Sequence, residues 1–194
     1  MFEFILAITL LLITPGPGVL TTAGVGSAYG YPTGLRFIVG LFIGTNLVAL
    51  AVVSGLAASL ESLPWLRLTL LIISAAYLGY LALKVAFAGS KIGFMSSSKA
   101  PTAWNAILLQ LINPKAYAVN STLFGGFNFM PDNLLLEVVI KFVLINLIWI
   151  PVHVLWLAAG VALKRMALTG KTQRAINIGM AVAMLTVVAM ALFL

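Results

Sequence analysis

An ionisable residue, Lys115, lies in the middle of a long apolar stretch of this chain. Placing an ionised lysine at the centre of a membrane costs about 2.5 to 3.5 kcal/mol, so such a residue implies a partner or a water-filled cavity. Its ammonium would be suited to binding an anion such as a substrate carboxylate. The alternative interpretation is a shifted or re-entrant helix, from which the side chain of Lys115 extends to the membrane surface.

The segment Thr14-Pro15-Gly16-Pro17-Gly18 has two prolines and two glycines within another apolar stretch. Because proline removes a backbone hydrogen bond and clashes with the preceding turn, we expect a helix to stop and restart here. A restarted helix presents free N–H groups and the positive end of its dipole, both of which favour a carboxylate. We therefore predict that this segment binds substrate together with Asn113, Pro114 and Lys115. The alternative is a structural kink without a ligand.

The sole histidine, His153, follows Pro151 by two residues in a further apolar stretch. It could titrate near neutral pH, or it could hydrogen-bond a carbonyl that Pro151 frees. We add His153 to the predicted pocket, together with the amides of Asn46 and Asn146. Polar groups inside membranes more often join helices than bind ligands. Three further residues of this kind are Thr45, Gln110 and Tyr117.

The composition is that of an integral membrane protein. Hydrophobic residues make up 62% of the chain and charged residues only 8%, against roughly 25% charged residues in soluble domains. The net charge of +7 is dispersed at the ends of apolar stretches, so we expect no nucleic-acid partner. Cysteine is absent, and no zinc-protease, hydrolase or phosphate-loop motif occurs. We therefore expect no catalytic residues, no metal site and no cofactor.

Six apolar segments reach the length of about 20 residues that a transmembrane helix needs. They cover residues 2–22, 35–60, 66–88, 104–124, 142–163 and 175–193. The predicted fold is an all-α integral membrane protein, with residues 1–194 forming a single transmembrane domain. The first segment lacks a basic leading region, so we expect it to be a retained span and not a signal peptide.

The basic residues predict the orientation of these six spans. On one side of the membrane, the connecting segments hold Arg36, Lys84, Lys91, Lys99, Lys164, Arg165, Lys171 and Arg174. The other side holds Arg67 and Lys141, with Glu3, Glu61, Asp132 and Glu137. Lysine and arginine favour the cytoplasmic side. Both termini are therefore predicted to be external, and every acidic residue is expected at a membrane edge or in a loop.

The two halves of the chain, about residues 1–100 and 101–194, share two features. The interruption at Pro15 has a counterpart at Pro114, and Asn46-Leu47 has a counterpart at Asn146-Leu147. With three spans in each half, the second half would insert upside down relative to the first. These offsets predict an inverted 3+3 repeat whose first and fourth helices are interrupted, a plan common among secondary transporters.

Four motifs in sequence resemble the lysine-exporter (LysE/RhtB-type) family of bacterial amino-acid and metabolite exporters. They are Thr14-Pro15-Gly16-Pro17, the stretch of residues 34–44, Ala75-Ala76-Tyr77-Leu78-Gly79-Tyr80-Leu81 and Leu111-Ile112-Asn113-Pro114-Lys115-Ala116. The resemblance implies a secondary transporter of the bacterial inner membrane that exports amino acids or related small metabolites, driven by an ion gradient. It also implies an amino-acid-like substrate as a partner, in addition to membrane lipid.

Two departures from the family pattern leave the substrate and the coupling ion open. Family members often carry an aspartate after the glycine of the second span, where this chain has Asn46, and His153 belongs to a stretch that is not a general family pattern. The motif Gly40-x-x-x-Gly44 permits close helix approach, so a homo-oligomer is compatible with the sequence. The alternative function is a non-transporting membrane scaffold or assembly protein, in which the kinks and glycines serve packing alone.

Overall fold

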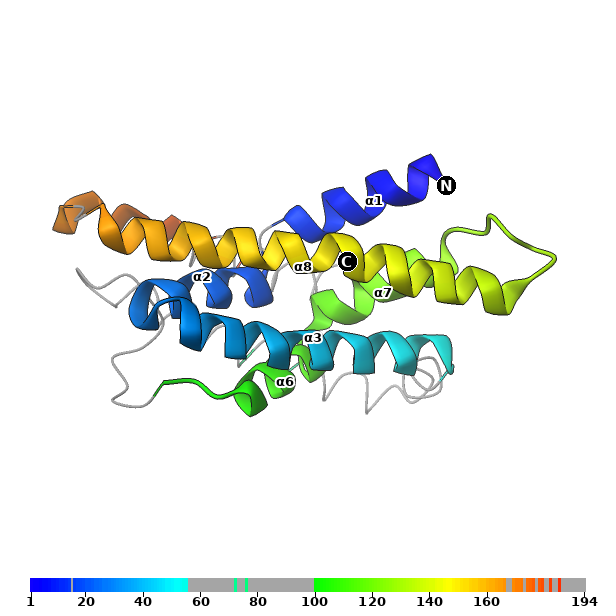
Figure 1. Cartoon of the computed structure of the whole chain (residues 1–194), viewed down its shortest axis with the longest axis horizontal. Helices are drawn as coiled ribbons and strands as arrows, with labels where there is room; N and C mark the ends of the chain where they lie inside the picture. The colour runs from blue at the N-terminus through cyan, green and yellow to red at the C-terminus, as the bar shows by residue number, and fades with distance from the viewer. Residues whose placement is uncertain are drawn as a thin grey trace.

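The computed structural model describes residues 1–14, 16–55 and 100–166, together with positions 72, 76, 169–172, 174–176, 178, 179, 182 and 185. Every regular element in this part of the chain is an α-helix, which confirms the predicted all-α class. Two long helices, α3 (Tyr31–Val53) and α8 (Leu134–Arg165), run along the molecule and pack against each other (Figure 1).

The remaining helices form two pairs, each separated by a short break. α1 (Phe2–Ile13) and α2 (Pro17–Tyr29) are bent by 51° at the first break. α6 (Ala103–Leu111) and α7 (Pro114–Gly125) flank the second break. Both second helices begin with proline, which fits the first turn of a helix because its missing N–H would have no partner there. The predicted interruptions at the first and fourth spans are therefore present.

Among the described residues, two helices are long and apolar enough to cross a membrane, namely α3 and the Leu134–Leu163 part of α8. The bent pair of α1 and α2 gives a third candidate if it is counted as one span. Most of the predicted spans at residues 66–88 and 175–193 lies outside the described residues, which include only positions 72 and 76 of the first and 175, 176, 178, 179, 182 and 185 of the second. The count of six spans therefore stays a prediction.

The fifth span begins earlier than the sequence suggested, at residue 134 instead of 142. Asn133 caps it, because its side-chain oxygen accepts a hydrogen bond from the backbone N–H of Leu136 at 3.1 Å. Glu137 and Lys141 therefore lie within the helix, where they form an ion pair with each other. Glu137 lies in the first turn of α8, near the end of the candidate span as expected, and the residue is only 1% exposed.

Close packing of α3 on α6 depends on two glycines. A Cβ atom added to Gly40 would lie 2.2 Å from the carbonyl oxygen of Ala103, and one added to Gly44 would lie 2.7 Å from Cβ of Gln110. Both distances are too short for real atoms, so no other residue fits without a shift of the helices. The Gly40-x-x-x-Gly44 face is thus used inside the chain, and the homo-oligomer remains untested.

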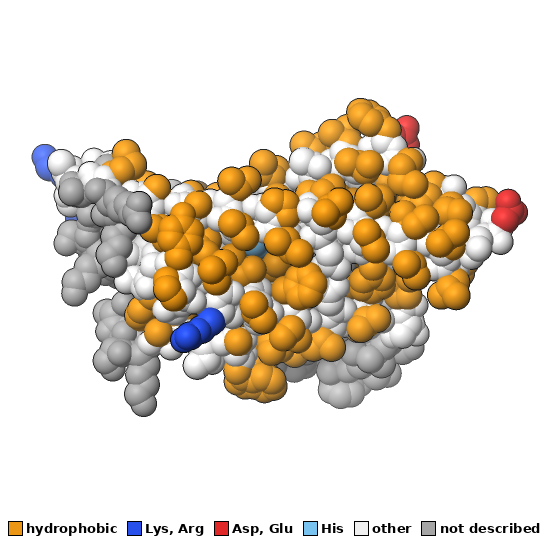
Figure 2. Space-filling model, in the orientation of Figure 1, with side chains coloured by type: hydrophobic (Ala, Val, Ile, Leu, Met, Phe, Trp, Pro, Cys, Tyr) orange, Lys and Arg blue, Asp and Glu red, His pale blue; other side chains and the backbone are white. Residues whose placement is uncertain are grey.

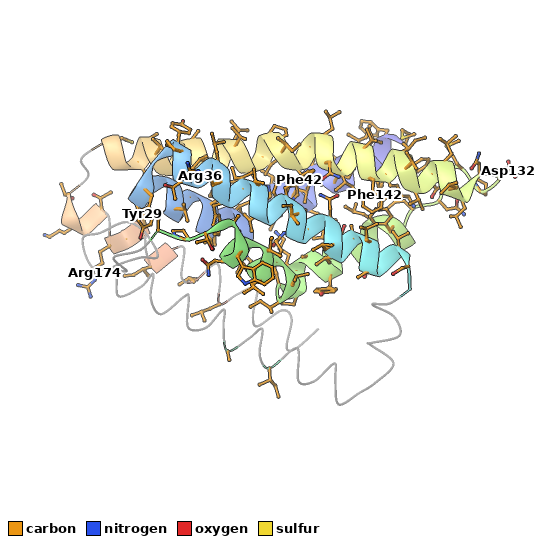
Figure 3. The ribbon with its side chains drawn as sticks, turned by 60° about the horizontal axis from the view of Figure 1, so that its bottom comes forward. Tyr29, Arg36, Phe42, Asp132, Phe142 and Arg174 are labelled. Carbon is orange, nitrogen blue, oxygen red and sulfur yellow. The ribbon has the colours of Figure 1, made fainter. Side chains whose placement is uncertain are left out.

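The surface is apolar along the length of the molecule and charged mainly toward its ends (Figure 2). On α8, the side chains of Leu135, Leu147 and Leu155 are each at least 67% exposed. Arg36 and Arg174 lie toward one end of the molecule and Asp132 lies at the other (Figure 3). An apolar girdle between charged ends is the surface that a lipid bilayer requires.

Candidate functional site

The first break places a helix N-terminus inside the molecule. Gly16 is the N-cap of α2, and its carbonyl accepts the N–H of Leu20 at 3.0 Å. The N–H groups of Gly18 and Val19 precede this first bond and so have no acceptor within the helix. Both residues are buried and line a cavity. The start of α2 thus offers hydrogen-bond donors and a positive dipole end to that cavity.

The second break places another helix N-terminus at the same cavity. The side-chain oxygen of Asn113 accepts the N–H of Lys115 at 3.1 Å, which caps α7. The amide nitrogen of Asn113 donates to Oε1 of Gln110 at 2.9 Å. The hydroxyl of Tyr117 donates to the carbonyl of Leu111 at 2.9 Å. The polar groups around this break are therefore satisfied by nearby side chains, as an apolar environment demands.

Lys115 joins the two breaks. Its ammonium donates a hydrogen bond to the carbonyl oxygen of Thr14, the residue that ends α1. Its stem passes beside Gly16, where an added Cβ would lie 2.7 Å from Cδ and 3.2 Å from Nζ of Lys115. Within the described residues, no carboxylate forms an ion pair with this ammonium. Lys115 therefore carries a positive charge between two helix breaks with only a neutral partner.

His153 approaches the cavity from α8. Its Nδ1 lies 2.9 Å from the carbonyl oxygen of Trp149, and its ring stacks on that indole with centroids 3.5 Å apart. The bonded carbonyl belongs to Trp149, whereas Pro151 frees the carbonyl four residues before it, on Leu147. The bond thus differs from the one that the sequence suggested as an alternative role.

These groups line a partly open cavity of about 50 Å³. Of the predicted site residues, Thr14, Gly16, Pro17, Gly18, Asn113, Lys115 and His153 line it. Pro114 lies between two lining residues as the first residue of α7, while Pro15 is outside the described residues. Four polar or aromatic lining residues were not among the predicted set, namely Thr45, Gln110, Asn120 and Trp149.

Asn46 and Asn146 lie outside this cavity lining and bind each other. Each side-chain amide donates to the oxygen of the other, at 3.1 and 2.9 Å. Each amide also donates to the carbonyl four residues earlier, on Phe42 at 2.8 Å and on Phe142 at 3.0 Å. The two asparagines therefore join α3 to α8 through an interaction in which the partners play identical roles.

A second lysine, Lys141, is buried toward the N-terminal end of α8, where its ammonium has three oxygen acceptors. Its Nζ is 2.7 Å from Oε1 of Glu137, and it also donates to the carbonyls of Phe124 and Phe127. Glu137 in turn accepts the backbone N–H groups of Phe129 and Met130. We name Glu137 and Lys141 the α8 ion pair. The i, i+4 spacing of the two residues was the sequence signal that could have revealed it.

The apolar exposed helices and the two interrupted pairs around a polar cavity are features of integral membrane proteins with broken helices. A model of the LysE type translocator family matches residues 9–194. An uncharacterized membrane protein of Pseudomonas aeruginosa is 29% identical over 129 residues, which cover 59% of this chain and 57% of that relative. The chain thus aligns with less than two thirds of this relative. No solved structure matches this chain.

The chain belongs to the LysE type translocator family, because the family model covers nearly its whole length. This membership confirms the resemblance seen in the sequence motifs.

Proposed function

We propose that this protein is a transporter that exports amino acids or related small metabolites across the bacterial inner membrane, and that the substrate carboxylate binds beside Lys115. The observation that carries the proposal is the ammonium of Lys115 at the cavity, with the carbonyl of Thr14 as its hydrogen-bond acceptor. A carboxylate would pair with this charge, and the N–H groups of Gly18 and Val19 could donate to the same anion.

The cavity volume implies that the helices move during transport. About 50 Å³ is room for a few water molecules and too little for most amino acids. Substrate would therefore enter when the α1–α2 pair separates from the α6–α7 pair. The hydrogen bond between Lys115 and Thr14 links these pairs, and a carboxylate that takes over the ammonium would break this link.

An inverted repeat would supply two equivalent moving parts. The reciprocal pair of Asn46 and Asn146 supports it, because equivalent residues that contact each other with identical roles lie on a two-fold axis. Their back-bonds to Phe42 and Phe142 keep the same offset of 100 residues. We place the axis of the proposed repeat at this amide pair, between α3 and α8.

Efflux from cells tests the proposed function. Cells that express the chain are loaded with amino acids and dipeptides, and the release of each solute is measured. Lys115→Met should reduce the release to that of cells without the protein, while leaving its abundance and melting temperature unchanged or raised, because a buried charge is removed. Lys171→Met is the matched control, since Lys171 is exposed. Full efflux by Lys115→Met would show that the substrate carboxylate does not bind at Lys115. Release by the unmodified protein that never exceeds that of cells without it would favour the scaffold alternative.

The proposed orientation puts the end with Arg36 and Arg174 in the cytoplasm and both termini outside. Because the chain contains no cysteine, single cysteines report their side of the membrane cleanly. In intact cells, Asn133→Cys should react with an impermeant thiol reagent and Thr172→Cys should not. The reverse pattern of labelling would invert the orientation.

A further inference from the structure

The imidazole of His153 has one nitrogen available to the cavity. A carbonyl oxygen only accepts hydrogen bonds, so Nδ1 must carry the hydrogen that bonds Trp149 in the neutral ring. Nε2 then holds a lone pair. A Cβ added to Gly18 would lie 3.6 Å from Nε2 and 3.5 Å from Oε1 of Gln110. The lone pair therefore lies near the N-terminus of α2, in the same cavity as Lys115.

The groups around His153 are almost all uncharged. The cavity brings Gly18 from α2, Thr45 from α3 and Gln110 from α6 against it, and Lys115 from α7 is the one charged lining residue besides His153 itself within the described part of the chain. None of the acidic residues of the described ranges lines the cavity; these are Glu3, Asp132 and Glu137. A proton that enters this cavity therefore finds His153 as its available base.

We propose that His153 is the proton-binding group that couples export to a proton gradient, an inference that rests on the proposed function. Nε2 takes a proton from water on the outer side and becomes an N–H donor. After the site opens inward, the ammonium of an amino-acid substrate donates to Nε2 while its carboxylate pairs with Lys115. Nε2 can accept this hydrogen bond only through a free lone pair. The proton that Nε2 carried must therefore leave to the cytoplasmic water first.

This exclusion produces exchange of one proton for one substrate. Proton and substrate ammonium compete for the same lone pair, so they cross the membrane in opposite directions. The site therefore selects solutes that carry both a carboxylate and a protonated amine. The stacking of Trp149 on the imidazole keeps the ring oriented toward the cavity in both states and favours the cationic ring.

The single histidine allows a direct test with the proton as the only ligand. The whole protein is labelled with ¹⁵N-histidine, purified through a histidine-free tag, and titrated by NMR. We expect a neutral ring protonated at Nδ1, and reversible protonation of Nε2 over a pH range in which the protein stays folded. In Lys115→Met the half-point should rise by about one pH unit or more, because a like charge is removed. Lys171→Met should leave it unchanged.

Three results of this titration would overturn the proposal. They are a neutral ring protonated at Nε2, no protonation in that range, and a half-point that Lys115→Met does not move. None of them requires a transported solute, so a failure to find efflux would defeat the proposed function without deciding the role of His153.

A transport measurement separates coupling from packing. In proteoliposomes with the amino acid that shows the largest Lys115-dependent efflux, counterflow by the unmodified protein should depend on pH, because protonated His153 excludes the substrate. His153→Gln should lose both this pH dependence and the accumulation driven by a pH gradient. Glutamine keeps a polar side chain of similar length but binds no proton near neutral pH. Accumulation by His153→Gln equal to that of the unmodified protein would show that another group carries the proton.

Discussion

Lys115 and Lys141 are the same residue type inside the same set of helices, but their ammonium groups have different surroundings. Lys141 is 2% exposed and is bound by the carboxylate of Glu137 and two backbone carbonyls. Lys115 is only partly buried and donates to the carbonyl of Thr14 beside a cavity. A charge whose partners are all supplied by the protein holds the structure together. A charge with a neutral partner and adjacent space is available to a ligand.

The largest expected effect is loss of stability in Lys141→Met. Removing one member of a buried ion pair leaves the other charge without its counterion. The melting temperature in detergent should fall on the order of 10 °C. Adding Glu137→Gln should restore part of it, because no uncompensated carboxylate then remains. If Lys141→Met melts at the same temperature as the unmodified protein, Lys141 does not stabilise the fold and the distinction from Lys115 fails.

A smaller effect is expected at Gly16, which lies against the stem of Lys115. In Gly16→Ala the new methyl group would meet Cδ at 2.7 Å and push the flexible side chain of Lys115 aside. Transport should fall several-fold with little change in melting temperature. Gly125→Ala is the matched control, since an added Cβ there has nothing within 4 Å. Equal transport by the two variants would mean that the exact position of the ammonium is unimportant.

The smallest effect is expected at the uncharged pair of Asn46 and Asn146. A double-mutant cycle with alanine at both positions should give a coupling of about 0.6 kcal/mol, typical of hydrogen bonds between membrane helices. The coupling is a difference in the free energy of unfolding, so it is measured by unfolding in detergent and not by transport. A coupling far above about 1.7 kcal/mol would exceed the known range for such bonds and would make the amide pair a stabilising element comparable to the α8 ion pair.

Local sequence chemistry predicted the helix breaks. Proline and glycine act on their own backbone, so the interruptions next to Gly16 and at Asn113 could be inferred without any knowledge of packing. The same reasoning placed Lys115 and His153 in one pocket. Lys115 lies at an interruption, whereas His153 follows Pro151 in a helix that continues without one.

The remaining features depend on contacts between distant segments or between charges. Two charged residues in an apolar stretch look like the edge of a span when each is counted separately, so Glu137 and Lys141 suggested a boundary that α8 does not have. The partners of Asn46 and Asn146 could not be predicted from either residue, because an amide binds whatever group packing places beside it. Their matching offset was visible, but their mutual contact was not.

The first turn of α1 packs against a part of the chain that is synthesised much later. Phe4 is fully buried between the rings of Phe127 and Phe129, and the ammonium of Lys141 lies 5.9 Å from its ring centroid. At a synthesis rate of ~5–20 residues per second, the ribosome needs on the order of ten seconds to reach these partners. During that interval α1 must remain in the membrane without its native contacts. Assembly of this end of the protein is therefore a late event in biogenesis.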